Sequence, residues 1–147
     1  MIVVGIDGSR GSESALRFAA EEAKLHDVKL RVVIAWHIAA TIYMSTSALA
    51  QVNPETLQQE TQKVAEEEVE RVLGPQRSEN IEVVARQGDA AGVMIDESKR
   101  AQILVVGSRG HGGFTGLLLG SVGQQCASHS HCPVVVVHPP PKSAESA

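Results

Sequence analysis

Along this chain, short runs of apolar residues alternate with longer segments in which apolar residues recur every three or four positions. Continuous runs of valine and isoleucine are typical of strands that are buried on both faces, and the longer period is typical of amphipathic helices. Five of the runs are predicted to be strands because they are short and rich in β-branched residues. They are Ile2–Ile6, Leu30–Ala35, Ile81–Ala85, Ile103–Val106 and Pro133–His138.

Four of the intervening segments are predicted to be helices. Ser12 and Asp89 are of the residue types that cap helix N-termini, and Gly74 with the proline after it is typical of a helix end. The predicted helices are one with Ala15, Leu16, Ala19 and Ala23 on its buried face, Glu55–Leu73 with Leu57, Val64, Val69, Val72 and Leu73 as its apolar stripe, a short one from Asp89 to about Arg100, and one from Ser121 to about Ser130. The connection 37–54 is long, which is typical of a functional or mobile segment.

This alternation predicts an α/β fold, namely a single-domain, doubly wound, five-stranded parallel sheet with helices on both faces. We predict the strand order 3-2-1-4-5. The 147 residues suffice for one such domain, expected over 1–139, and residues 140–147 are expected to be a disordered tail. Ligands bind such sheets where the strands end, so Asp7, Ala35 and Gly107 are predicted to be neighbours.

Composition and charge narrow the possible functions. The chain is 43% hydrophobic and carries a net charge of −4, so it is globular and poorly suited to neutralising the phosphates of a nucleic acid. No apolar run is long enough to cross a bilayer, and the N-terminal MIVVGIDGS has neither the basic nor the long apolar part of a signal peptide. We therefore expect a cytoplasmic protein that binds neither nucleic acid nor membrane.

The two cysteines are interpreted as structural. Cys126 and Cys132 are too few for a disulfide framework, and in a cytoplasmic protein they are expected to be reduced and partly buried. Together with His129 and His131 they resemble a metal cluster, but their spacing matches no standard zinc pattern. We therefore predict no metal site in this segment.

The segment GSRGHGGFTGLLLGS, residues 107–121, follows the fourth predicted strand and is rich in glycine. Glycine lets a backbone approach an anion closely, and the start of a helix offers unpaired amides and a positive dipole end. Here those amides belong to Ser121 and Val122, and the Ser121 hydroxyl is expected to cap the helix or bond a phosphate oxygen. A turn that merely connects two elements would account for one or two glycines, so we predict a phosphate site.

The spacing of the glycines identifies the kind of phosphate loop. No Gly-Lys-Ser/Thr follows, which excludes a Walker A loop, and the dinucleotide fingerprint Gly-x-Gly-x-x-Gly is absent. Gly107, two residues, Gly110, nine residues and then Gly120-Ser121 resemble the nucleotide-binding signature of the universal stress protein family, in its ATP-binding branch. The resemblance extends over the chain through VVGIDGS, IAW, VVGSRGHGG and HCPVVVVH.

The resemblance implies a role for each matching residue. Gly5 and Asp7 would flank the nucleotide, with Asp7 toward the ribose or base, and the backbone at Ala35 would meet adenine. Asp7 has an alternative role in an Asx-turn at the start of the next loop. Arg109 and His111 lie in the loop and would add charge at the phosphates. The alternative for both is exposure to solvent, which is what we expect for His111. The phosphates would be held by Gly107, Gly110, Gly120, Ser121 and Val122.

The resemblance also implies a homodimer that forms through the fifth strand. An apolar edge strand such as Val134–Val137 needs covering, and antiparallel pairing with a second copy covers it. Leu117–Leu119 pack either under the glycine loop or against that second copy, and the sequence does not separate the two.

The expected function is that of an ATP-binding universal stress protein, with Mg²⁺ accompanying the nucleotide, acting as a regulatory or stress-response switch. The alternatives are a weak ATPase or phosphotransferase and a cyclic AMP- or AMP-binding protein with the same pocket. Phosphoryl transfer needs a metal and a group that orients the nucleophile, but no lysine, aspartate or glutamate lies between Gly107 and Ser121. We therefore expect slow hydrolysis at most and assign no catalytic residue. A structural protein without a ligand would not need the glycine pattern.

Overall fold

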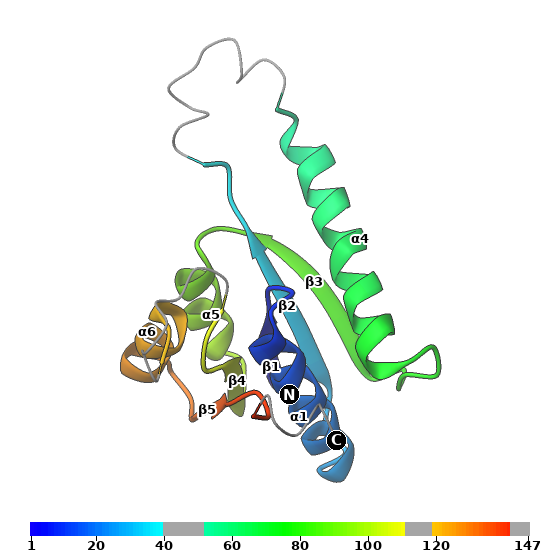
Figure 1. Cartoon of the computed structure of the whole chain (residues 1–147), viewed down its shortest axis with the longest axis vertical. Helices are drawn as coiled ribbons and strands as arrows, with labels where there is room; N and C mark the ends of the chain where they lie inside the picture. The colour runs from blue at the N-terminus through cyan, green and yellow to red at the C-terminus, as the bar shows by residue number, and fades with distance from the viewer. Residues whose placement is uncertain (40–51, 111–118, 142–147) are drawn as a thin grey trace.

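The computed structural model describes residues 1–39, 52–110 and 119–141, and its strands form one parallel sheet in the order β3-β2-β1-β4-β5 (Figure 1). This confirms the predicted α/β doubly wound fold and its strand order. The elements in chain order are β1 Ile2–Ile6, α1 Arg10–Leu25, β2 Leu30–Trp36, α4 Pro54–Leu73, β3 Ile81–Gln87, α5 Ala90–Ser98, β4 Ile103–Gly107, α6 Ser121–His129 and β5 Val134–Val137.

The sheet reverses its direction of growth at β1. The strand β1 pairs with β2 on one side, where Ile2 lies opposite Leu30, and with β4 on the other side, where Ile2 lies opposite Ile103. The chain therefore leaves the carboxyl ends of β1 and β4 toward different helices. Such a point of reversal opens a crevice between the two connections, which is where doubly wound sheets bind ligands.

Two helices cover each face of the sheet. On one face, Leu16 of α1 and Val69 of α4 are fully buried in a large apolar cluster with Val4 and Val32. On the other face, α5 and α6 enclose a smaller cluster that includes Met94. In Figure 1, α5 and α6 lie together beside β4 and β5, and α4 runs along β3 at the other end of the sheet.

Two details of the predicted helices are wrong. The first helix begins at Arg10, one turn before the expected place, because Ser9 is its N-cap: the Ser9 side chain accepts a hydrogen bond from the Ser12 amide. On α4, Val64 is 55% exposed and Ala65 is fully buried in its place. Ala65 lies four residues before the buried Val69, so it faces the sheet as the helical period requires.

The edge strand β3 is bonded along its outer side by glutamine side chains of α4. Gln62 Nε2 donates to Val83 O at 2.7 Å, and Gln62 Oε1 accepts from Ala85 N at 2.8 Å. Gln58 Nε2 donates to Ala85 O at 2.8 Å, and Gln58 Oε1 accepts from the indole of Trp36. These two side chains bond three of the backbone groups that a further strand would otherwise bond.

Ion pairs join charged side chains of β3 to α5 and to β2 with the lysine before it. The carboxylate of Glu97 on α5 has no exposed surface and accepts from Arg31 Nε at 2.8 Å and from Arg86 Nη1 at 2.7 Å. Glu82 of β3 pairs with Arg31 and Lys29 at 3.0 and 2.8 Å. Burial alone would raise the pKa of Glu97, but the hydrogen bonds from the two arginines outweigh it and lower that pKa.

Several predictions fall outside the described residues. The connection 37–54 is described only at its two ends, and α4 begins within it, at Pro54. Residues 111–118, with His111 and two of the three consecutive leucines, and residues 142–147 of the tail are not described. The boundary between domain and tail therefore stays a prediction.

Candidate functional site

A cavity of about 230 Å³ lies at the carboxyl ends of the strands, between the sheet and the helices α5 and α6. Side chains alternate along a strand, so every second residue faces this cavity. Met94 and Ala90 of α5 form one wall, and the first turn of α6 forms another. The floor consists of Gly5 and Asp7 from β1 and the turn after it, Val33 and Ala35 from β2, and Val106 and Ser108 from the end of β4.

All nine residues that the sequence predicts for the site line this one cavity. They come from four separate parts of the chain, which the crossing of the strands brings together. The arrangement does not by itself assign a role to any of them. The nine are Gly5, Asp7, Ala35, Gly107, Arg109, Gly110, Gly120, Ser121 and Val122.

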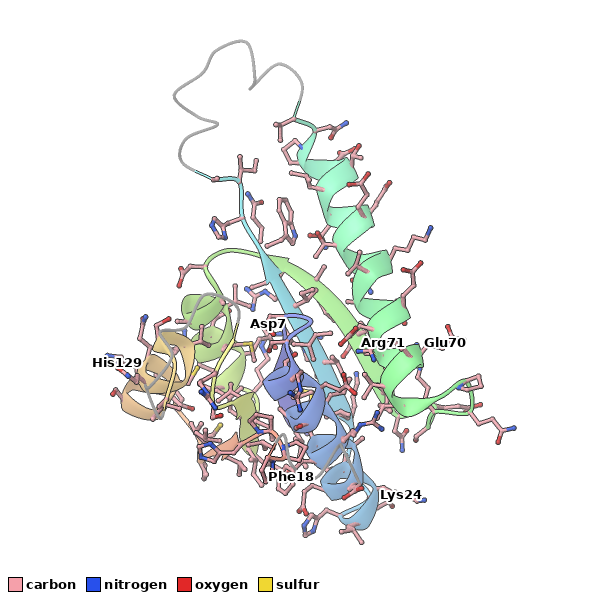
Figure 2. The ribbon with its side chains drawn as sticks, in the orientation of Figure 1. Asp7, Phe18, Lys24, Glu70, Arg71 and His129 are labelled. Carbon is pink, nitrogen blue, oxygen red and sulfur yellow. The ribbon has the colours of Figure 1, made fainter. Side chains whose placement is uncertain are left out.

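Asp7 takes part in a local turn and lines the cavity at the same time. Its Oδ1 accepts the Ser9 amide at 2.9 Å and also the Ser9 hydroxyl, which is the hydrogen-bond pattern of an Asx-turn. Its Oδ2 is directed at Gly110, where an added Cβ would lie 2.5 Å away. Figure 2 shows Asp7 near the middle of the molecule, at the turn between β1 and α1. The turn fixes the direction of the carboxylate toward the glycine loop.

The glycines of the loop have different physical reasons to be glycine. A Cβ on Gly107 would lie 2.6 Å from the carbonyl carbon of Gly11, so the start of α1 can pack on β4 only if both backbones lack side chains there. Gly120 differs, because the nearest described atoms to an added Cβ are 3.5 Å away and its φ of −72° suits any residue. The packing of the described residues therefore does not require glycine at position 120.

The helix α6 begins at the cavity without a side-chain cap. Gly120 is its N-cap, and no described side chain accepts a hydrogen bond from its first turn, so capping by the Ser121 hydroxyl is not observed among the described residues. Within the described part of the chain, the amides of Ser121 and Val122 have no hydrogen-bond partner. Two donors and the positive end of the helix dipole thus meet at one wall of the cavity.

The described lining of the cavity is a poor set of metal ligands. Asp7 is its one carboxylate, and Arg109 contributes a positive charge. Among all the described residues, no group of three His, Cys, Asp or Glu side chains is placed to hold a metal ion. Cys126 is buried on α6, and burial, with a smaller effect from Cys132, raises the pKa of its thiol to about 11. The amides of Ser121 and Val122 and the guanidinium of Arg109 make the described lining better suited to an anion than to a metal ion.

The sequence prediction missed several residues that line the cavity. Val33 lies two residues before Ala35 on β2, so the period of a strand could have identified it. Ala90 and Met94 could not have been found in this way, because only the packing of α5 on the sheet brings them to the site. The residues missed are Ile6, Ser9, Ser12, Val33, Ala90, Met94, Val106, Ser108 and Gly123.

The family model described as the universal stress protein family matches residues 1–138. The chain belongs to this family. A universal stress protein from Mycolicibacterium smegmatis is 36% identical over 144 residues, which cover 93% of this chain and 47% of the relative. This chain thus spans about half the length of the curated universal stress proteins that it matches.

Solved structures of universal stress proteins share the fold. One, crystallised in complex with cAMP, is 27% identical, with a TM-score of 0.66, and the match covers 95% of this chain and 96% of that one. The protein MJ0577 aligns with a TM-score of 0.73 at 18% identity over 96% of this chain and 97% of its own, which supports the fold alone. In the described part of this universal stress protein, no helix is long and apolar enough to cross a membrane.

Proposed function

We propose that this universal stress protein binds an adenine nucleotide in the cavity between β1, β4 and α6, and that its ligand is ATP accompanied by Mg²⁺. The protein acts in the cytoplasm as a regulatory or stress-response switch whose state depends on occupancy. The related protein in complex with cAMP supports an adenine nucleotide as the ligand class. The glycine spacing from Gly107 to Gly120 supports a phosphate chain in particular.

The observation that carries this proposal is the wall formed by Gly120 and the first turn of α6. The described residues give no packing reason for glycine at position 120, and the two amides that follow it have no described partner. A phosphate group explains both features, because it needs close approach to the backbone and takes hydrogen bonds from free amides.

The remaining residues of the cavity fit the other parts of the nucleotide. Ala35 and Met94 offer an apolar surface for adenine, and Asp7 offers carboxylate oxygens to the hydroxyls of the ribose. Arg109 adds a positive charge beside the phosphates. Mg²⁺ would be held mainly by the phosphates, since Asp7 is the one carboxylate in the described lining and its Oδ1 already accepts two hydrogen bonds.

Binding rather than catalysis is the role that these groups support. Phosphoryl transfer requires a metal held against the γ-phosphate and a group that orients the nucleophile. The described lining contains no lysine or histidine, so we expect hydrolysis to be slow at most. A second candidate ligand is cyclic AMP or AMP, because the related structure holds cAMP and the adenosine contacts would be the same.

We further propose that two copies pair antiparallel through β5. Its four valines are only partly buried, and no described side chain bonds to its outer side, in contrast to β3. Pairing with a second copy would satisfy the outward amides and carbonyls.

The test of the nucleotide proposal is titration of ATP, AMP and cAMP into the unchanged protein and into Gly120→Ala and Gly120→Val by calorimetry. Both variants should fold, because the backbone at Gly120 suits any residue and the nearest described atoms leave room for a Cβ. We expect Gly120→Val to weaken ATP binding by more than the roughly tenfold change that one lost hydrogen bond gives.

Gly107→Ala is the matched control, because it adds a side chain at a glycine that the packing of the fold requires. It should destabilise the protein, because its Cβ would lie 2.6 Å from the backbone of Gly11. Unchanged ATP affinity in a folded Gly120→Val protein would show that this wall does not hold phosphate.

A further inference from the structure

The hydroxyl of Ser108 is buried in the floor of the cavity without a partner. Ser108 directly follows β4, has no exposed surface and lines the cavity. Its Oγ has no hydrogen-bond partner among the described residues. A buried hydroxyl in this state costs free energy, so folded proteins retain few of them, and those they retain call for an explanation. The glycine signature does not include this residue.

The backbone of Ser108 is fixed on both sides. Its amide donates to Val137 O at 2.9 Å, and its carbonyl accepts from Gly120 N at 2.6 Å. Gly107 faces α1, and Val106 belongs to the apolar cluster under α5 and α6. The alternation along β4 therefore directs the Ser108 side chain to the α5/α6 face, where the cavity lies.

The groups around this hydroxyl indicate what it bonds. The unpaired amides of Ser121 and Val122 and the guanidinium of Arg109 line the same cavity, and all of them are donors. A ligand group that bonds several of these donors must carry several acceptor oxygens, as a phosphate does. Arg109 and Gly110 are exposed whereas Ser108 is fully buried, so a phosphate chain that reached Ser108 would do so with its most deeply placed group.

We propose that Ser108 Oγ donates a hydrogen bond to the phosphate group that is attached directly to the nucleoside. This inference rests on the proposed nucleotide function and adds one specificity-determining residue to it. The bond would discriminate a nucleotide from a nucleoside, because adenosine has no phosphate oxygen to accept it.

The experiment compares Ser108→Ala with the unchanged protein in calorimetric titrations of adenosine, AMP and ATP. We expect the affinities for AMP and ATP to fall about tenfold and the affinity for adenosine to stay the same. Without ligand, the midpoint of thermal unfolding should rise, since the variant buries no unpaired hydroxyl. With AMP in excess, the ligand-induced rise in that midpoint should shrink.

Two further variants test whether the effect comes from the Ser108 hydroxyl itself, and not from the loss of any buried serine or of side-chain volume. Ser98 is also buried, but its hydroxyl donates to Ile95 O at 2.6 Å and accepts from His131 N at 2.9 Å. Ser98→Ala should therefore lower the unfolding midpoint and leave all three affinities unchanged. Ser108→Cys fills the serine volume with a weaker donor, so it should lose affinity for AMP and ATP as Ser108→Ala does.

Three outcomes would overturn the inference. If the unchanged protein binds AMP and ATP and both Ser108 variants bind them equally well, Ser108 does not contact the phosphate, whereas the proposed function stands. If adenosine affinity falls as much as AMP affinity, the hydroxyl bonds the ribose or the base. If the unchanged protein binds no nucleotide, the proposed function fails and this inference with it.

Discussion

The two edge strands of the sheet differ in whether side chains bond their outward backbone groups. At β3, the side chains of Gln58 and Gln62 bond three of the outward backbone groups, and ion pairs join other side chains of the strand to α5 and β2. At β5, four partly buried valines form the strand, and within the described residues no side chain bonds its outer backbone groups. A strand edge whose backbone groups are bonded by side chains is a poor template for another strand, so the proposed pairing of two copies would use β5.

The largest effect, loss of the proposed dimer, is expected from Val136→Pro, which removes a backbone hydrogen-bond donor from β5. Pro133 O and Val137 O accept from β4, so the two-residue period of the strand turns the Val136 amide outward. Proline is tolerated in an edge strand at such a position. We expect the dimer to be lost completely and a folded monomer to remain, as measured by analytical ultracentrifugation with circular dichroism.

Val135→Pro is the control for this variant, because the Val135 amide points toward β4 and its loss should destabilise the fold itself. A Val136→Pro protein that sediments as the unchanged dimer would rule out β5 as the interface, and a monomeric unchanged protein would rule out the dimer.

The next largest effect is expected from Gln62→Ala at the closed edge. The substitution leaves Val83 O and Ala85 N without the side chain that bonds them. We expect a loss of about 2 kcal/mol in the free energy of unfolding, measured by urea denaturation, because two backbone groups lose their partner. Gln62→Glu is informative as a partial repair, since its carboxylate still accepts from Ala85 N but cannot donate to Val83 O. Equal stability of Gln62→Ala and the unchanged protein would mean that these bonds do not protect the edge.

The smallest effect on stability is expected when the pH is lowered, because acid protonates the carboxylates in the ion pairs of β3. The pKa values of Glu82 and Glu97 are both lowered in the folded protein, so their stabilising contribution is complete above the ordinary glutamate pKa of about 4.3. This contribution is lost as the pH falls through the lowered values. We expect Glu97→Gln to reduce the dependence of the unfolding midpoint on pH below about 4.5. If the variant and the unchanged protein lose stability in parallel over that range, Glu97 does not carry this dependence.

The fold could be predicted largely because each strand is a run of β-branched residues between helical segments. The predicted details of the helices fail where two neighbouring residues suit the same position. Ser9 and Ser12 both suit an N-cap, and the choice depends on how closely Gly11 can approach β4, which is a tertiary contact. Val64 and Ala65 compete in the same way, because hydrophobicity favours valine whereas the helical period places alanine against the sheet.

The lining of the site was predicted where glycine spacing or strand ends indicated it. Met94 escaped notice because nothing in the local pattern of α5 distinguishes a residue above the cavity from one above the core. Ser108 was not predicted for another reason. A serine between a glycine and an arginine is ordinary in sequence, and only the burial of its hydroxyl without a described partner distinguishes it.

In the proposed dimer, the glutamines along β3 would also limit how many copies can add to the sheet. A subunit with two open edges can add copies at both ends and extend without limit into a fibre, because every addition exposes a new edge. Here Gln58 and Gln62 terminate one end, so two copies joined through β5 would present only terminated edges to the solvent. Two five-stranded sheets joined in this way would form one continuous sheet of about ten strands. Two glutamine side chains in each copy would thus prevent that sheet from growing into a polymer.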